Sequence, residues 1–273
     1  MLIEKTFRGD FNKFLNKIII GEPFAFTRFS DGELRILQNK KLICKKNEMW
    51  IGDHEVKNHI YQEEDYKVFE PDKHQFFREK LLESLQFKKK NYYKGISCKC
   101  CLSGKHGYTV EEEFNWQVEL SGLDKYDEHL TWSNLFVNGN YPYFLEHMLP
   151  YFFNYNIIII CNEKYNIKTL PFYNKIVKNY RVGFNCMENN YHLIDDIKCY
   201  ITDNNIKNHL FLFSAASLSN FLSHQLFEFN NENTYLDIGT TLHPFMGGRL
   251  DRGYLRAYWL NSGEPDINKI CIW

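Results

Sequence analysis

The stretch Phe26-Thr27-Arg28-Phe29-Ser30-Asp31-Gly32-Glu33-Leu34 decides the fold, because an apolar run ends there in two carboxylates separated by one glycine. The run from Pro23 to Phe29 predicts a buried strand, and Ser30 or Asp31 can cap the helix that Leu34 and the residues after it indicate. Such a corner between a strand and a helix lies at the carboxyl edge of an α/β sheet, where ligands usually bind.

The carboxylates of Asp31 and Glu33 have two interpretations. Two hard oxygen ligands beside a glycine can approach one divalent cation, and that cation can neutralise a diphosphate. Alternatively, Ser-Asp-Gly-Glu is ordinary turn chemistry followed by an acidic first helical turn. The motif alone favours the second interpretation, and the rest of the chain favours the first.

Composition limits the classes of function. The chain has 273 residues, is 44% hydrophobic, and carries 33 Lys and Arg against 34 Asp and Glu, a net charge of -1. The net charge therefore provides no overall electrostatic attraction to nucleic acid or to an anionic membrane. The 23 Phe and 18 Tyr can offer flat faces on which sugar rings stack. Neither a repeat nor a linker divides the sequence, so we expect one domain over residues 1–273, with an N-terminal part of about 1–150 and a C-terminal, Rossmann-like part of about 151–273.

The sequence favours a cytoplasmic location. Charge appears too early after Met1 for a signal peptide, and no apolar run approaches the length of a transmembrane segment. Peripheral attachment to a membrane, or the host cytoplasm if the source is viral, stays open.

Eight cysteines occur, most of them scattered in apolar surroundings that predict buried free thiols. Cys98-Lys99-Cys100-Cys101, with His106 nearby, suggests zinc. Structural zinc sites generally have wider spacing and a second pair of thiols, and the sequence shows no such pair. We therefore expect residues 96–102 to form a core strand.

Strand and helix patterns alternate along the chain. Helical patterns cover residues 7–19, 71–90, 111–117, 168–179 and 218–229, and strand patterns cover 156–161, 180–184, 209–213 and 234–239. The alternation predicts an α/β, Rossmann-like fold with a mostly parallel sheet flanked by helices.

The turn Ser214-Ala215-Ala216-Ser217-Leu218-Ser219-Asn220 is a second candidate site. A strand that feeds small residues into a helix exposes backbone amides, and Ser214 and Ser217 add hydroxyls, so a pyrophosphate can bind there. Small residues also permit close packing of helix on sheet, and the sequence does not separate the two interpretations. No GxGxxG or Walker pattern occurs.

A third candidate is Asp237-Ile238-Gly239-Thr240-Thr241-Leu242-His243, polar residues just past a strand. Asp237 and His243 suit proton transfer, metal binding or ribose binding, whereas the simpler interpretation makes them a cap and a loop histidine. Arg249 and Arg252 follow on a glycine-rich segment, and arginine forks suit diphosphate.

The segment from Thr131 to Tyr143 interleaves aromatic rings with amides. Rings and amide donors together suit an array of sugar hydroxyls, so acceptor binding is assigned to Trp132, Asn134, Asn138 and Tyr141. Core packing plus a turn is the alternative for any single ring.

Three of these motifs carry a resemblance to a known family. Arg28-Phe29-Ser30-Asp31-Gly32-Glu33 resembles the signature of the GT-D fold glycosyltransferases. The segments 211–216 and 235–239 are similar to that family's Gly-Pro-small-small turn and Asp-Ile-Gly strand end, in the same order. Ser214-Ala215-Ala216 departs from the glycine-proline opening, and Thr240 to His243 replaces a histidine that commonly follows the strand directly.

The resemblance implies a GT-D fold hexosyl- or pentosyltransferase that uses Mn²⁺ or Mg²⁺ at Asp31 and Glu33. It further implies a nucleotide-sugar donor, with a UDP-sugar expected first, and a hydroxyl of a glycan, glycopeptide or glycolipid as acceptor. Expected catalytic residues are Asp31, Glu33, Asp237 and His243, and expected donor contacts are Arg28, Ser30, Ser214, Ala215, Ser217, Asp237, Arg249 and Arg252. Two other classes stay open: a non-catalytic nucleotide-sugar or carbohydrate-binding protein, and a metal-dependent phosphoesterase. The donor base, the sugar, the stereochemical outcome and the oligomeric state do not follow from these motifs.

Overall fold

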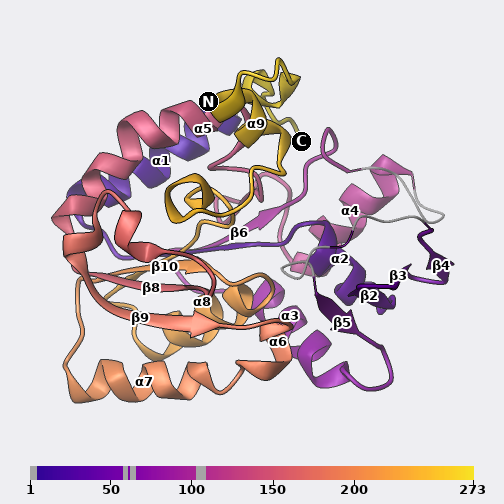
Figure 1. The fold of residues 1–273 in the computed structure, drawn as a ribbon, viewed down its shortest axis with the longest axis horizontal. Coiled ribbons are helices and arrows are strands. Elements are labelled where there is room, and N and C mark those ends of the chain that lie inside the picture. Colours follow the sequence, from indigo (N-terminus) through magenta and orange to yellow (C-terminus); the bar gives the residue numbers. More distant parts are fainter. Residues whose placement is uncertain (1–4, 58–60, 62–65, 103–108) are drawn as a thin grey trace.

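Seven short apolar segments pair as the strands of one sheet in the computed structural model, which describes residues 5–57, 61, 66–102 and 109–273 (Figure 1). In spatial order the strands are β7 (Leu130–Trp132), β6 (Tyr92–Ile96), β1 (Ala25–Arg28), β11 (Thr234–Asp237), β10 (Leu210–Ser214), β8 (Ile157–Asn162) and β9 (Ile176–Val182). Every neighbouring pair is parallel. The mostly parallel α/β sheet expected from the sequence is therefore confirmed.

Both faces of this sheet are buried. Within β8, Ile157 and Ile159 join one hydrophobic core, whereas Ile158 and Ile160 join the other. Successive side chains of a strand point to opposite faces, so an uninterrupted isoleucine run is what a doubly covered strand requires.

Helices cover the two faces (Figure 1). One core includes residues of α1 (Phe7–Ile20), α5 (Tyr141–Tyr143) and α9 (Gly253–Leu260). The other includes residues of α2 (Asp31–Leu37), α3 (Gln75–Gln86), α4 (Val110–Ser121), α6 (Cys186–Asn189), α7 (Leu193–Asp203) and α8 (Leu218–Phe229). In the described residues, short turns of 3-10 or π type lie at Asn138–Asn140, Phe144–Met148, Leu149–Asn154, Ile167–Thr169, Tyr173–Lys175, His243–Met246 and Pro265–Asn268. None of the described helices has the length and hydropathy of a membrane span.

The order of the strands creates a topological switch point. From β1 the chain proceeds to β6 and then β7 on one side, while β11 and β10 lie on the other side of β1. Ligands of open α/β sheets bind outside the carboxyl ends of the strands at such a point. The carboxyl ends of β1, β10 and β11 are therefore where a site is expected.

A second, smaller sheet is absent from the sequence-based expectations. Its antiparallel strands run in the order β4 (His54–Glu55), β3 (Glu48–Ile51), β2 (Leu42–Lys45) and β5 (Lys67–Phe69). The strands are two to four residues long and mostly half-buried, so they lack the buried apolar runs that identify the larger sheet. In Figure 1 this sheet lies beside α2 at one end of the molecule.

Two expected elements are wrong. Residues 168–179 do not form a helix, because Pro171 interrupts the pattern, and the segment instead holds two 3-10 turns and the start of the edge strand β9. Residues 96–102 do not continue as a strand: β6 ends at Ile96, and the N–H groups of Cys101 and Leu102 turn back to donate to the carbonyl of Cys98.

Candidate active site

The three motif-bearing strands are neighbours, so their ends share one cavity. Phe26 of β1 pairs with Leu236 of β11, and Phe213 of β10 pairs with Asp237. The cavity beyond these ends has a volume of about 830 Å³, within the range of small-molecule sites. Most of the residues expected from the sequence line it, namely Arg28, Ser30, Asp31, Glu33, Asn134, Asn138, Ser214, Ala215, Ser217, Asp237, His243, Arg249 and Arg252.

The corner after β1 forms the helix cap that one interpretation of the Asp-x-Glu motif expects. Ser30 is the N-cap of α2, and its backbone N–H donates to Glu33 Oε2 at 3.1 Å. The Ser217 hydroxyl donates to Glu33 Oε1 at 2.6 Å, and Glu33 is buried. Asp31 is exposed at the cavity, with Oδ1 accepting only the adjacent amide of Gly32 among the described contacts. Glu33 is thus held by two hydrogen bonds, whereas Asp31 is exposed and, within the described residues, accepts only from the adjacent Gly32 amide.

Arg28 projects from the end of β1 towards the end of β11. Its Nε donates to the carbonyl of Ser133 at 2.6 Å, and its own carbonyl accepts from the Asn220 side chain at 2.8 Å. Gly239 has a φ of 52°, and a Cβ there would lie 1.8 Å from Arg28 Nη1. The Asp-Ile-Gly strand end therefore has a physical reason for its glycine: the guanidinium occupies that space.

Asp237, the last residue of β11, is buried beside Arg28 and Glu33. Burial raises the pKa of its carboxyl to about 7, against the opposing effect of the Arg28 guanidinium and with a further contribution from Glu33. The Gly239 amide donates to Asp237 Oδ1 at 3.0 Å. A carboxyl with a pKa near neutrality can accept and release a proton at physiological pH.

His243 also lines the cavity. Its Nε2 is 3.3 Å from Ser214 Oγ, and its Nδ1 is 3.4 Å from the Tyr165 hydroxyl. Burial lowers the pKa of His243 to about 3, and the cations of Arg252 and Arg249 lower it further. The imidazole is therefore neutral near pH 7 and is a weak base.

The turn after β10 is only partly available to a phosphate. The N–H of Ala215 already donates to Ser219 Oγ at 3.2 Å, and the Ser217 hydroxyl is committed to Glu33. Ser214 and the exposed Ala216, which has a φ of 45°, remain at the cavity wall. The turn thus contributes Ser214 and orients Glu33 rather than presenting a row of free amides.

Two of the four expected acceptor residues do not reach the cavity. Trp132 is buried against Trp273, with ring centroids 4.5 Å apart. Tyr141 is fully buried, and its hydroxyl donates to the carbonyl of Thr241 at 3.1 Å. Both rings pack in the core, so the structure does not support an acceptor role for either, whereas Asn134 and Asn138 do line the cavity.

Residues from unexpected places complete the cavity wall. Lys67 comes from β5 of the small sheet, and its ammonium would lie 3.2 Å from a Cβ at position 32. Tyr165 follows β8, and Lys269 comes from the C-terminal segment. No sequence motif marks these residues, because their elements reach the site only through the tertiary fold.

The carboxylates fit a divalent cation in part. Mg²⁺ in nucleotide sites is commonly held by one or two carboxylates together with phosphate oxygens, and Asp31, Glu33 and Asp237 offer that donor chemistry in one cavity. Among the described residues, the group of three or more metal-ligating side chains within mutual reach is formed by cysteines elsewhere, not by these carboxylates. By themselves, Asp31, Glu33 and Asp237 therefore do not form such a group of metal ligands.

No protein-family model matches the sequence, and no curated protein is similar to it. Solved structures do match in three dimensions. A DUF1792 glycosyltransferase from Streptococcus sanguinis aligns with 93% of this chain and 84% of its own, at a TM-score of 0.50 and 13% identity. A structure described as the domain of unknown function 1792 with a distinct glycosyltransferase fold aligns with 96% of this chain and 90% of its own, at a TM-score of 0.51 and 11% identity.

These structural matches identify the fold. The chain has the glycosyltransferase fold seen in the DUF1792 structures, which is the GT-D fold expected from the sequence motifs.

Proposed function

We propose that this protein is a metal-dependent glycosyltransferase that moves a sugar from a nucleoside-diphosphate sugar to a hydroxyl of a glycan or glycoconjugate. The observation that carries the proposal is the convergence of the ends of β1, β10 and β11 on one cavity of about 830 Å³ in a glycosyltransferase fold. The cavity holds carboxylates beside arginines, which is the chemistry that a cation-bound diphosphate requires.

Several arginine side chains line the cavity. Arg28 is oriented by Ser133, and Arg249 pairs with Asp251 at 3.2 Å on the segment before α9. In this proposal these guanidinium groups and Arg252 bind phosphate oxygens, while Asp31 and Glu33 hold Mn²⁺ or Mg²⁺. When bound, the cation supplies stabilisation of the negative charge that develops on the leaving diphosphate.

Asp237 is the better candidate for the base that accepts the proton of the acceptor hydroxyl. Its pKa of about 7 matches physiological pH, whereas the pKa of His243, about 3, leaves the imidazole too weak a base. His243 is assigned instead to orientation of Ser214 and Tyr165, both of which contact its ring nitrogens.

The activity is tested with a panel of UDP-, GDP- and dTDP-sugars, each with Mn²⁺, with Mg²⁺ or with EDTA. Release of nucleoside diphosphate only when an acceptor is present, and only with the cation, supports transfer. A melting shift with one nucleotide identifies the donor base, with UDP expected first.

Two outcomes would replace the proposal. Binding of a donor with no turnover under any cation would indicate a carbohydrate-binding or nucleotide-sugar-binding protein. Release of inorganic phosphate or sugar phosphate without an acceptor would indicate a phosphoesterase. If the Asp31→Ala and Glu33→Ala variants transferred sugar at the wild-type rate, the assignment of the cation to these two carboxylates would be wrong.

A further inference from the structure

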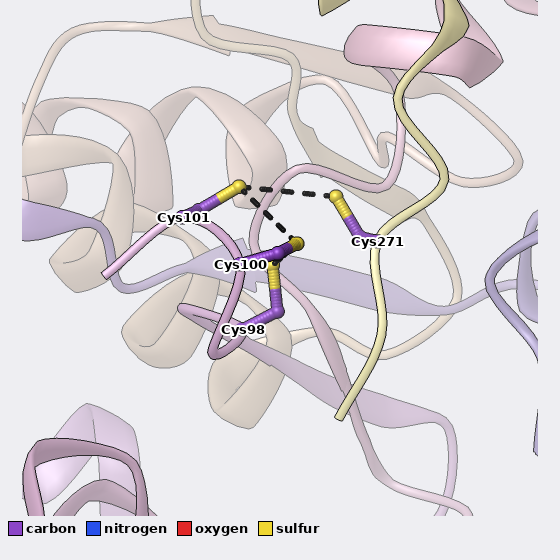
Figure 2. A group of neighbouring side chains, drawn as sticks. All are labelled: Cys98, Cys100, Cys101 and Cys271. Atoms are coloured by element: carbon purple, nitrogen blue, oxygen red, sulfur yellow. Dashed lines mark hydrogen bonds between the residues drawn. The ribbon is translucent and has the colours of Figure 1, made fainter. Parts of the chain in front are cut away.

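Four cysteine thiols meet at a point outside the carboxylate corner. Cys98, Cys100 and Cys101 lie on the turn after β6, and Cys271 lies on the segment after the last 3-10 turn. Figure 2 shows the four sulfur atoms directed towards one another from two separate parts of the chain. The four Sγ atoms all lie within 4.8 Å of one another.

The spacing of these atoms is close to that around a single tetrahedral ion. The sulfur atoms are 3.3 Å apart for Cys98 and Cys100, 3.9 Å for Cys100 and Cys101, and 3.9 Å for Cys101 and Cys271. Four sulfurs at about 2.3 Å from a tetrahedral Zn²⁺ are about 3.8 Å apart. The cysteines are free thiols rather than disulfides, and a cluster of several irons would hold its thiolates farther apart.

The surroundings suit negatively charged sulfur. Asn138 Nδ2 lies 3.5 Å from Cys271 Sγ and 3.8 Å from Cys101 Sγ, and the backbone N–H of Ile272 bonds to Cys100. The Lys269 ammonium interacts with Cys101. Such outer donors hold and neutralise metal-bound thiolates. A purely apolar packing of thiols would not require an amide and an ammonium on the same sulfur atoms.

We propose that Cys98, Cys100, Cys101 and Cys271 bind one structural Zn²⁺. The thiols supply all four positions, so the site is closed and has no place for substrate or water. It is separate from the cation of the proposed transfer reaction, and it does not depend on that reaction. The protons of the thiols that ionise leave to solvent when the metal binds.

The site would fix one wall of the cavity. Cys101, Asn138 and Lys269 line the cavity as well as contacting the cluster, and the carbonyl of Lys269 accepts the N–H of Gly139 at 3.0 Å. The metal therefore connects the C-terminal segment to the β6–α4 connection beside the candidate active site. Cys101 and Cys271 are 170 residues apart, so the ion closes a long loop and its binding energy stabilises the folded state.

The test measures metal in the protein as purified in reducing buffer without added zinc. After dialysis against EDTA, which removes a cation held by Asp31 and Glu33, elemental analysis is expected to find about one zinc per chain. Modification of the thiols by a mercurial reagent should release that zinc in stoichiometric amount, as seen with a chromogenic chelator.

Variants separate the cluster from other thiols. Cys271→Ser and Cys100→Ser should lose the zinc and lower the melting temperature by several degrees or more. Cys199→Ser, an exposed thiol on α7, is the matched control and should keep both zinc and stability. If the cluster variants do not fold, Co²⁺ added to metal-free wild-type protein should give the intense absorption of tetrahedral Co²⁺ bound to thiolates.

Three results would overturn the proposal. The first is a purified protein with negligible zinc whose metal-free form shows no thiolate-to-cobalt absorption. The second is the mass of a disulfide between cluster cysteines in freshly prepared protein. The third is zinc that remains in the cysteine variants but disappears in Asp31→Ala.

Discussion

Burial shifts the pKa values of Asp237 and His243 in opposite directions, because one is an acid and the other a base. Burial penalises the charged form of each, so the pKa of Asp237 rises to about 7 and that of His243 falls to about 3. Both groups are therefore neutral over much of the acidic range, although both face the same cavity. In the proposed mechanism, the assignment of the proton-accepting role to Asp237 follows from this difference in pKa.

The first prediction concerns the pH dependence of transfer. With Asp237 as base, kcat/KM should rise with pH with an apparent pKa at or below about 7, because a nearby divalent cation would lower it. Asp237→Asn should lower kcat by about 10²- to 10⁴-fold and remove that rise. The His243→Gln variant should keep the rise of kcat/KM with pH. An Asp237→Asn enzyme with an unchanged profile would place the base elsewhere.

Gly239 gives the second prediction, because Arg28 occupies the space of its missing Cβ. Gly239→Ala should displace the guanidinium and weaken donor binding about tenfold or more, the loss expected for one charge-assisted hydrogen bond. Gly21→Ala is the control: its φ of 70° imposes a similar backbone strain, of about 1–2 kcal/mol, but no atom lies within 4 Å of the new Cβ. Donor affinity is measured by titration of the nucleotide. Equal affinities of the two variants would contradict the role of Arg28.

At the scale of elements, the sequence predicted the strands and helices that buried apolar runs form. The strands β1, β8, β10 and β11 are short apolar segments covered on both faces, and α8 occupies the expected residues 218–229. The small antiparallel sheet was missed because its strands are half-buried and carry mixed residues, for example Glu48 and Lys45. Long-range contacts decide such strands, and a single sequence does not show them.

The residues of the candidate site divide in the same way into those that the sequence predicted and those that it did not. Carboxylates and hydroxyls at the ends of predicted strands could be identified, since parallel strands bring their ends to one edge. Lys67 and Tyr165 could not be, since no motif connects them to that edge. Trp132 and Tyr141 were assigned to sugar binding because rings and amides alternate in residues 131–143, but nothing in that pattern distinguishes an exposed ring from a buried one.

The third prediction concerns the contact between α2 and α4. Arg35 Nη1 lies 2.9 Å from Glu113 Oε1, with 8% and 0% of the two side chains exposed. Arg35→Ala leaves a buried, unpaired charge and should lower the free energy of unfolding by about 3–5 kcal/mol. Lys80→Ala removes a more exposed pair with Glu83 on α3 and should cost less than about 1 kcal/mol.

Chemical denaturation checks this third prediction. A double variant, Arg35→Met with Glu113→Leu, removes both charges and should recover most of the lost stability. If Arg35→Ala and Lys80→Ala lowered the free energy of unfolding by the same small amount, the Arg35–Glu113 pair would not be shielded from solvent.

At the scale of the whole molecule, the switch between β1 and β11 explains why the site is where it is. Residues from the two halves of the sequence join one sheet, with β1, β6 and β7 from the first and β8 to β11 from the second. The cavity therefore contains groups from both halves, including the bond between Ser217 and Glu33 across 184 residues. In the proposed mechanism, stability and function are coupled at this junction, because the buried carboxyl groups of Glu33 and Asp237 serve both.

The last prediction follows from that coupling and concerns stability against pH in the presence of EDTA. Asp237 has a pKa of about 7 in the folded protein and an ordinary value of 3.8, so between these values the folded chain keeps a proton that the unfolded chain has lost. Its contribution to stability therefore falls as pH rises from about 4 to about 7. For His243, with a pKa of about 3 against an ordinary 6.5, the unfolded chain holds the extra proton, so its contribution falls as pH decreases from about 6.5.

Unfolding by urea at a series of pH values from about 4 to about 7.5 separates these two contributions, since other titrating groups cancel when each variant is compared with the wild type at the same pH. The stability of Asp237→Asn relative to wild type should rise by roughly a few kcal/mol from pH 4 to pH 7. The stability of His243→Gln relative to wild type should rise in the opposite direction, as the pH falls below about 6.5. A difference between Asp237→Asn and wild type that does not change with pH would show that the Asp237 carboxyl is already ionised in the folded protein, and the assignment of Asp237 as the base would then fail together with this prediction.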